Sequence, residues 1–325
     1  MRICITGGLG VIGSWITRAI IRKGMRPVVL SRNKDFSLLP DCVGAFDYFP
    51  CDIQDSELIN KIFIREKIDR LIHAAAITMA LSEQDPVEAV RVNSVGTAIV
   101  LDAAGKNNVE RVVLLSSGSI YDQWSKSAAD KKIRIDENFP IRPIHISRIT
   151  KVSAEEIGRY FSRRYGFQFV AIRSSTMYGP GKLRHHGSMA IHSLLIENAI
   201  QGLPTKVSQG GDQEDDIIYA ADIAAGVVAA CFGEKLTYDA YNIASGKAIT
   251  LRQFADAVQT VFPSAKIEIG GGKNYLGTGL VTDRVFDITR ARQDLKFEPK
   301  YDVLSAIENY RSMLATFEPM GTGVS

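Results

Sequence analysis

The chain has 325 residues, of which 46% are hydrophobic and 23% are charged. This composition is that of a globular protein with about two domains' worth of chain, so a single small module and a disordered or coiled-coil protein are excluded. The formal net charge of +3 is small and scattered, which argues against a nucleic-acid or membrane surface. No apolar run reaches the ~18 residues that a membrane span needs, and no signal-peptide pattern opens the chain. We therefore expect a cytoplasmic protein that acts on a small molecule.

Cysteine and histidine spacing gives no indication of a metal site. The four cysteines are Cys4, Cys42, Cys51 and Cys231. They form no CxxC pair, and free thiols suit a reducing compartment. A histidine group at His185, His186 and His192 has no nearby cysteine and no zinc-ligand spacing. We expect no bound metal.

The first half of the chain alternates between strand and helix patterns. Residues 2–6, 7–13, 14–23 and 26–30 read as strand, glycine-rich turn, helix and strand, which is one βαβ unit. Further strands are predicted at 45–49, 70–75, 111–115 and 169–172, with helices at 56–66, 86–107 and 147–165. This alternation predicts an α/β fold, a Rossmann-type doubly wound parallel sheet.

Beyond Tyr178 the alternation is lost. Helices are predicted at 188–201, 222–232, 251–261, 287–295 and 304–316, with a glycine loop at 270–272. We predict a dinucleotide-binding domain from residues 1–175, about 216–246 and a closing segment near 284–295. A smaller substrate-binding cap, interwoven with it, would comprise about 176–215, 247–283 and 296–325.

The turn after the first strand is the strongest local signal. Gly7, Gly10 and Gly13 stand between a strand and a helix, in the sequence TGGLGVIG. Without Cβ atoms the backbone can approach a pyrophosphate, which the free N–H groups at the helix start, including those of Val11 and Ile12, would bind. This segment is predicted to be a dinucleotide-phosphate site.

The spacing TGxxGxxG resembles that of the short-chain dehydrogenase/reductase superfamily, and the chain is identified as a member of its extended branch, the NAD(P)-dependent epimerase/dehydratase family. Segments similar to the family's motifs run through most of the chain, at 51–55, 73–76, 85–97, 111–117, 137–143, 173–181 and 216–222. The resemblance implies cofactor contacts at Asp52, Ile53, Ala74, Ala75 and Asn93, the first two around the adenine.

The choice of cofactor depends on the end of the second strand, where a carboxylate would bind the ribose 2′-hydroxyl of NAD. Ser31 occupies this position and Arg32 follows. A 2′-phosphate would meet a hydroxyl and a cation there, so NADP(H) is favoured, with NAD(H) as the alternative.

The reaction centre departs from the family pattern. The resemblance implies a hydroxyl donor at Ser117 and a lysine at Lys151 that binds the nicotinamide ribose. The tyrosine that should stand four residues before this lysine, as acid and base, is replaced by Ser147. An aliphatic hydroxyl is far less acidic than a phenol, so it cannot serve as the same proton shuttle.

Several groups could take the tyrosine's place. His145 lies two residues before Ser147, and histidine is the residue type best suited to acid and base work near neutral pH. Tyr121 or Tyr178 could reach the site from elsewhere, as could one of the three clustered histidines. Ser147 could also relay a proton through water to Lys151. The sequence leaves these alternatives open.

Two further departures concern the substrate. Nucleotide-sugar members of the family carry an Asn two residues before the Tyr of YGPG and an Arg before the DFVYVDD segment, whereas this chain has Thr176 and Asp215. A carboxylate would repel a diphosphate, which disfavours a nucleotide sugar and favours a smaller neutral or cationic molecule. Candidate substrate contacts are Thr78, Ser119, Tyr121, Thr176, Tyr178, His185 and His186.

The helices at 86–107 and 147–165 resemble the pair that forms a four-helix dimer interface in the family, which predicts a homodimer. On the second helix the apolar stripe is Ile149, Val152, Ile157, Tyr160 and Phe161. The expected function is an NAD(P)-dependent oxidoreductase acting on a small carbonyl or hydroxyl compound. The alternatives are an epimerase, dehydratase or lyase that keeps its cofactor tightly bound, and a dinucleotide-binding protein without catalysis.

Overall fold

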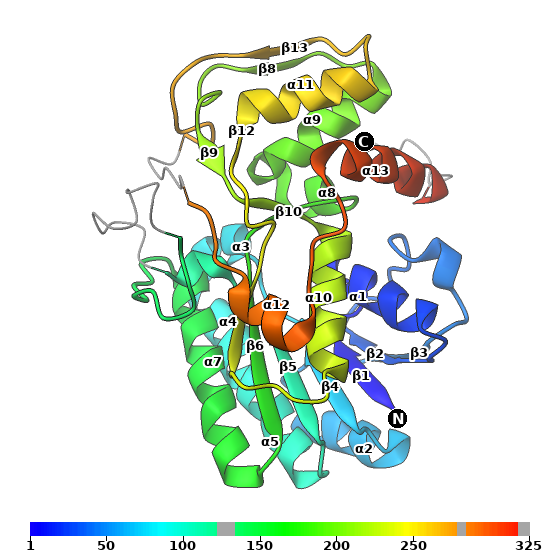
Figure 1. Cartoon of the computed structure of the whole chain (residues 1–325). Coiled ribbons are helices and arrows are strands. Elements are labelled where there is room, and N and C mark those ends of the chain that lie inside the picture. The colour runs from blue at the N-terminus through cyan, green and yellow to red at the C-terminus, as the bar shows by residue number, and fades with distance from the viewer. Residues whose placement is uncertain (122–133, 278–283, 318–325) are drawn as a thin grey trace.

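A seven-stranded, all-parallel sheet forms the centre of the protein (Figure 1). The computed structural model describes residues 1–121, 134–277 and 284–317. The strand order is β11-β6-β5-β4-β1-β2-β3, with the switch in winding direction between β1 and β4. The bounds are β1 (Ile3–Thr6), β2 (Val28–Ser31), β3 (Asp47–Pro50), β4 (Arg70–His73), β5 (Arg111–Leu115), β6 (Gln168–Ser174) and β11 (Ala240–Ile243). The predicted Rossmann-type sheet is confirmed.

Helices cover both faces of the sheet because its strands are apolar on both sides. In β1, Ile3 and Ile5 pack on one face with α1 (Val11–Arg22) and α10 (Ala220–Phe232). Cys4, which points the other way, packs on the opposite face. The helices on that second face are α2 (Ser56–Glu66), α5 (Thr97–Lys106) and α7 (Ile146–Tyr165).

The helix predicted at 86–107 consists of three pieces. Asp85 caps α4 (Pro86–Val90) by accepting a hydrogen bond from the Glu88 backbone. A π-helical turn, η2 (Arg91–Gly96), then leads directly into α5. Gly96 lies against Ile53, where a Cβ atom would be only 2.8 Å from the isoleucine side chain.

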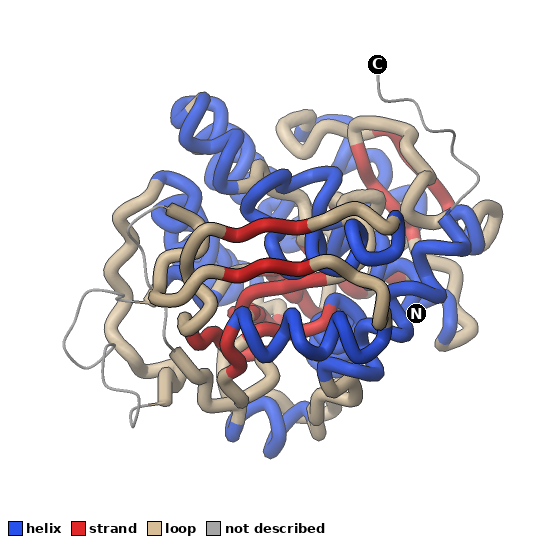
Figure 2. The backbone as a smooth tube through the Cα atoms, turned by 90° about the horizontal axis from the view of Figure 1, so that it is seen from above, coloured by secondary structure: helices blue, strands red, loops and turns tan. Residues whose placement is uncertain are grey.

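Smaller elements gather above the carboxyl ends of the strands (Figure 1). Three two-stranded sheets pair β7 with β10, β9 with β12 and β8 with β13; the last pair lies side by side when seen from above (Figure 2). Their bounds are β7 (Thr176–Tyr178), β8 (Thr205–Val207), β9 (Glu214–Asp215), β10 (Ile217–Tyr219), β12 (Ile249–Thr250) and β13 (Ile267–Ile269). The helices α8 (Lys182–His186), α9 (Ile191–Gln201), α11 (Leu251–Val261) and α13 (Val303–Phe317) complete this part, whereas α12 (Thr289–Leu295) packs beside β11 and α10.

The predictions for individual elements were best where apolar periodicity is strong. The helices at 56–66 and 251–261 have the predicted bounds. The helix predicted from residue 188 begins as a 3₁₀ turn (Gly187–Ala190) and becomes α-helical at Ile191. The two- and three-residue strands of the small sheets, α3 (Met79–Gln84) and α8 were not predicted, because runs this short carry little periodicity. Strand β11, which is as long as β1, was also missed. Among the described residues, no helix is long and apolar enough to span a membrane.

Candidate active site

The glycine-rich turn leads from β1 into α1 at the switch point of the sheet. Gly7 has φ +67°, and a Cβ atom there would lie 2.7 Å from the Ala75 backbone. A Cβ atom on Gly13 would lie 1.9 Å from the Gly7 carbonyl oxygen. Gly10 is the N-cap residue of α1 and offers no side chain to its free N–H groups, which include those of Val11 and Ile12. The close backbone approach and the free N–H groups would suit a pyrophosphate, so dinucleotide-phosphate binding by this turn stays a prediction.

Replacing Gly13 with alanine should therefore abolish dinucleotide binding, because the added methyl group forces the turn apart. We expect calorimetry to show at least a hundredfold weaker binding. The control is Gly44→Ala, since Gly44 also has positive φ (+86°) but has open space around it, away from the turn. Unchanged affinity in Gly13→Ala would contradict the assignment of the turn.

The adenosine end of the cleft lies beyond β2. Ser31 ends this strand and leaves no carboxylate there, and Arg32 is exposed, with its guanidinium 3.9 Å from the Asp52 carboxylate. Asp52 accepts a hydrogen bond from the Gln54 backbone, and Ile53 is buried. Arg32 therefore keeps guanidinium hydrogens available for a ligand.

The end of β4 is held by a neutral histidine. His73 Nε2 lies 2.9 Å from Thr97 Oγ1, whose hydroxyl donates to the Asn93 carbonyl, so the ring nitrogen must be the donor. His73 Nδ1 then accepts from Thr6 Oγ1 at 2.6 Å. Burial, with a contribution from Lys151, lowers the pKa of His73 to about 3. The predicted cofactor segment at Ala74 and Ala75 follows directly and stays partly exposed.

Asn93 positions that segment. Its side chain accepts a hydrogen bond from the Ile77 N–H at 2.7 Å and donates to the Ile77 carbonyl and to Thr150 Oγ1. All its polar atoms are thus engaged with protein, which differs from the expected cofactor contact. Thr78, partly exposed, follows as the N-cap residue of α3.

The predicted catalytic residues gather at the carboxyl end of β5. Ser117 Oγ accepts from the Ser119 backbone and lies 2.8 Å from Ser119 Oγ, and both side chains are partly exposed. Lys151 Nζ donates to the Leu115 carbonyl at 2.6 Å. Burial lowers the pKa of Lys151 to about 8 even though Glu155 opposes the shift. Ser147, partly exposed, lies one helical turn before Lys151 on α7.

A buried ion pair supports this end of α7. Glu155 accepts from Arg173 at 2.7 and 3.1 Å and from the Ser116 hydroxyl. Both charged side chains are nearly inaccessible, with exposed fractions of 1% and 3%. The pair fixes the helix against β5 and β6.

Neither candidate tyrosine is available as acid or base. Tyr121 is fully buried, donates to Asn242 Oδ1 at 2.7 Å and accepts from Arg173. Tyr178 is buried in an aromatic cluster that includes Tyr219 and Phe254. Desolvation raises the pKa of both phenols far above 10. Their predicted catalytic and substrate-contact roles are therefore corrected to structural ones.

The histidine group is also dispersed. His192 is buried with its ring 4.8 Å from that of Phe254, and desolvation lowers its pKa to about 4. His185 is exposed on α8, where Arg184 pairs with Asp35 beyond β2, so it lies toward the adenosine end instead of the substrate end. Desolvation lowers the pKa of His186 to about 3, which keeps this ring neutral.

Two further predicted positions are also accessible to a ligand. His145 is partly exposed as the N-cap residue of α7, with Nδ1 3.5 Å from Glu83 Oε1. Thr176 is exposed at the start of β7.

Among the described residues no group of three histidine, cysteine or acidic side chains could hold a metal ion.

Asp215 is turned into the protein. It is buried and accepts hydrogen bonds from Gln213 Nε2 and from the Tyr275 hydroxyl. Asp216 accepts from Ser245 and from the backbone of Phe286. Because these donors are neutral, the negative charge of Asp215 remains, and its predicted effect on an anionic substrate stays a prediction.

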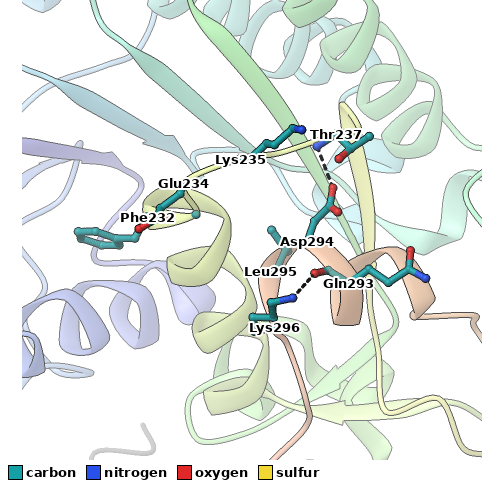
Figure 3. A pocket seen from close by; sticks show the side chains of 9 residues that line it. Phe232, Glu234, Lys235, Thr237, Gln293, Asp294, Leu295 and Lys296 are labelled. Carbon is teal, nitrogen blue, oxygen red and sulfur yellow. Dashed lines mark hydrogen bonds between the residues drawn. The ribbon is translucent and has the colours of Figure 1, made fainter.

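One groove lies away from this site. Phe232, Thr237, Asp294 and Lys296 help to line it, between the ends of α10 and α12 (Figure 3). Asp294 accepts from the Thr237 backbone, and Lys296 donates to the Gln293 carbonyl. Helix α10 ends shortly before β11 begins, so the groove lies at the amino ends of the strands. The glycine-rich turn lies at their carboxyl ends, on the opposite side.

The comparisons with known proteins agree with the fold. UDP-glucose 4-epimerase of Halalkalibacterium halodurans is 26% identical over 328 residues, covering 94% of this chain and 93% of the relative. Two solved structures have the same fold. The UDP-glucose 4-epimerase of Thermotoga maritima with UDP-glucose has a TM-score of 0.83 at 23% identity, covering 97% of this chain and all of that one. The UDP-glucose 4-epimerase of Thermus thermophilus with NAD has a TM-score of 0.79 at 23% identity, covering 96% and 99%.

A family model gives the assignment. The NAD dependent epimerase/dehydratase family matches residues 3–244, which is most of the chain and includes the glycine-rich turn, Ser117 and Lys151. The resemblance drawn from the motifs is thereby confirmed. The chain belongs to the NAD-dependent epimerase/dehydratase family of enzymes.

Proposed function

We propose that the protein is an NAD(P)-dependent oxidoreductase that interconverts a hydroxyl and a carbonyl group at one carbon of its substrate. The nicotinamide, when bound, supplies the hydride chemistry. Ser117 donates a hydrogen bond to the reacting oxygen. The neutral amine of Lys151 takes the hydroxyl proton through the Ser147 hydroxyl, and returns it in the reverse direction.

The lowered pKa of Lys151 is the observation that carries this proposal. With a pKa of about 8, the amine exchanges its proton near neutral pH, which the Ser147 hydroxyl cannot do alone. Residues four apart on a helix have Cβ atoms about 5–6 Å apart, within reach of a relay. The engagement of Tyr121 and Tyr178 elsewhere leaves Lys151 as the better candidate.

The test is an assay of the purified protein, stripped of nucleotide, with NAD(P)⁺ and a panel of UDP-glucose, hexoses and small hydroxy compounds. We expect absorbance of the reduced cofactor to rise with at least one of them. The names of the relatives favour a second candidate, epimerisation with a retained cofactor. This would give an isomeric product with no net reduction. Failure to bind either dinucleotide would overturn both.

The preference for NADP(H) remains part of this proposal. It is supported by the absence of a carboxylate at Ser31 and by the exposed guanidinium of Arg32. Arg32→Ala should weaken NADP binding about tenfold or more and leave NAD binding unchanged, because one charge-assisted hydrogen bond is lost. Arg22→Ala, at the far end of α1, is the control. Equal affinity of the native protein for both dinucleotides would refute the preference.

We also propose a homodimer in a reducing, cytoplasmic environment. Ile149 and Tyr160 of the predicted stripe are 45% and 52% exposed on α7, and Val87 and Val90 are 60% and 41% exposed on the adjoining α4. Val152, Ile157 and Phe161 instead pack against the core. The four cysteines are buried free thiols, which supports a reducing compartment.

A further inference from the structure

Two buried arginines beside the proposed reaction centre have side-chain nitrogens without a hydrogen-bond partner among the described residues. Arg148 and Arg284 are 7% and 9% exposed. In the described part of the chain, Nε of both residues and Nη1 of Arg284 are buried and have no hydrogen-bond partner. Arg18 and Arg70 also have one such nitrogen each, but their guanidinium groups bond elsewhere, to Asp41 and to the Cys231 carbonyl.

Arg148 is part of the catalytic helix. It follows Ser147 directly and precedes Lys151 by three residues and Glu155 by seven, so all three lie on one face of α7. That face meets the end of β5, because Lys151 donates to the Leu115 carbonyl and Glu155 accepts from Ser116. The side chain of Arg148 is thus buried toward the end of the cleft that holds Ser117.

Arg284 reaches the same place from the other side. Its guanidinium lies 5.7 Å from the centre of the Phe286 ring. That ring lies against Gly118, where an added Cβ atom would be 2.6 Å from it, and 6.1 Å from the Tyr121 ring. Gly118 follows Ser117, so Arg284 lies over the turn that begins at the proposed hydroxyl donor.

The charges of the two arginines act on each other. Desolvation and the charge of Arg148 lower the pKa of Arg284 to about 10, against the opposing effect of Asp215 and Asp216, so Arg284 stays charged at neutral pH. Desolvation also lowers the pKa of Arg148, and Glu83 opposes that shift. The nearby carboxylates attract the arginines but accept their hydrogen bonds from other groups: Asp215 from Gln213 and Tyr275, Asp216 from Ser245, and Glu83 from the Ile146 backbone. The buried nitrogens of the two arginines therefore still lack a hydrogen-bond partner in the described part of the chain. Two like charges with buried, unused donors are costly unless an anion pairs with them.

From this geometry we infer that Arg148 and Arg284 form a binding site for an anionic oxygen group of the substrate, a carboxylate or a phosphate ester, next to the carbon that reacts at Ser117. The inference rests on the proposed function, because it names the substrate class of that same site. Guanidinium groups bind such oxyanions through paired N–H donors. The expected neutral or cationic substrate is accordingly replaced by an anionic one.

The test compares glucuronate, glucose 6-phosphate and glucose by calorimetry against the NADP⁺-loaded protein. We expect at least one anion to bind ten times more tightly than glucose, and Arg148→Met and Arg284→Met to remove that preference. A preference for glucuronate alone identifies a carboxylate, and one for glucose 6-phosphate alone identifies a phosphate ester. Arg184→Met, an exposed arginine on α8, is the control. Equal binding of all three ligands overturns the inference.

Stability provides a readout that does not depend on the ligand. Removing an unpaired buried charge should leave the urea midpoint of the unliganded protein unchanged or raise it. A clear fall in both variants would make the arginines structural and overturn the inference. Tight anion binding without any cofactor reduction would instead overturn the proposed redox function and leave the anion site standing.

Discussion

Replacing Lys151 with methionine is expected to lower the rate of hydride transfer by about 10²–10⁴-fold, the contribution typical of a positioned acid or base. In the native protein, alcohol oxidation should rise with pH through about 8, since the neutral amine accepts the proton and the pKa of Lys151 lies there. Carbonyl reduction should fall over the same range, because it needs the protonated amine. Steady-state absorbance of the reduced cofactor measures both.

A second variant separates proton transfer from positioning. Lys151→Arg keeps a positive charge but cannot lose its proton, so the pH dependence near 8 should disappear. Lys106→Met, which removes an exposed lysine of α5, is the matched control. If Lys151→Arg kept the native rate and pH profile, the proton would have to pass through another group, and His145 would be the next candidate.

Arg173→Met should cost about 3 kcal/mol or more in the free energy of unfolding. The change leaves Glu155 buried at 1% exposure without its principal partner, although Arg159 still lies 3.2 Å away. The Tyr121 hydroxyl loses a donor as well. Urea denaturation followed by circular dichroism measures the loss.

An exposed ion pair on the surface provides the control for the Arg173→Met variant. Lys61 and Glu57 form an ion pair on α2 with 73% and 84% of their side chains exposed, so Lys61→Met should change stability by less than about 1 kcal/mol. The double variant Arg173→Met/Glu155→Met should regain part of the loss, because no buried charge remains unpaired. Equal costs for Arg173→Met and Lys61→Met would show that the buried pair contributes little.

The local sequence was sufficient to predict those features of the candidate site that depend on the spacing of residues along the chain. The three glycines predict the phosphate cradle because a Cβ atom would clash with backbone atoms at Gly7 and Gly13 and would crowd the Gly7 carbonyl at Gly10. Ser147 and Lys151 are one helical turn apart, so the absence of the tyrosine is evident from the sequence alone. The long parallel-sheet strands follow from their apolar runs.

Contacts between residues far apart in the chain determine the roles of several side chains that sequence spacing cannot assign. Tyr121 follows the catalytic serine closely enough to suggest a role, but its hydroxyl bonds to Asn242, 121 residues away. His192 belongs to a histidine group in the sequence and to an aromatic cluster in the fold. Arg148 and Arg284 were missed, because an arginine in a helix start or after a loop is usually solvated, and only their burial distinguishes them.

The π turn at Arg91–Gly96 sets the rotational phase of the helix that continues from it. Each residue advances an α-helix by about 100°, so the wider turn offsets the faces of α4 and α5 from those of one continuous α-helix. This offset allows Asn93 to point toward Ile77 while Val100 and Leu101 still face the sheet. One face of the segment from 86 to 106 therefore supports the proposed cofactor cleft, and another face of the same segment packs in the core.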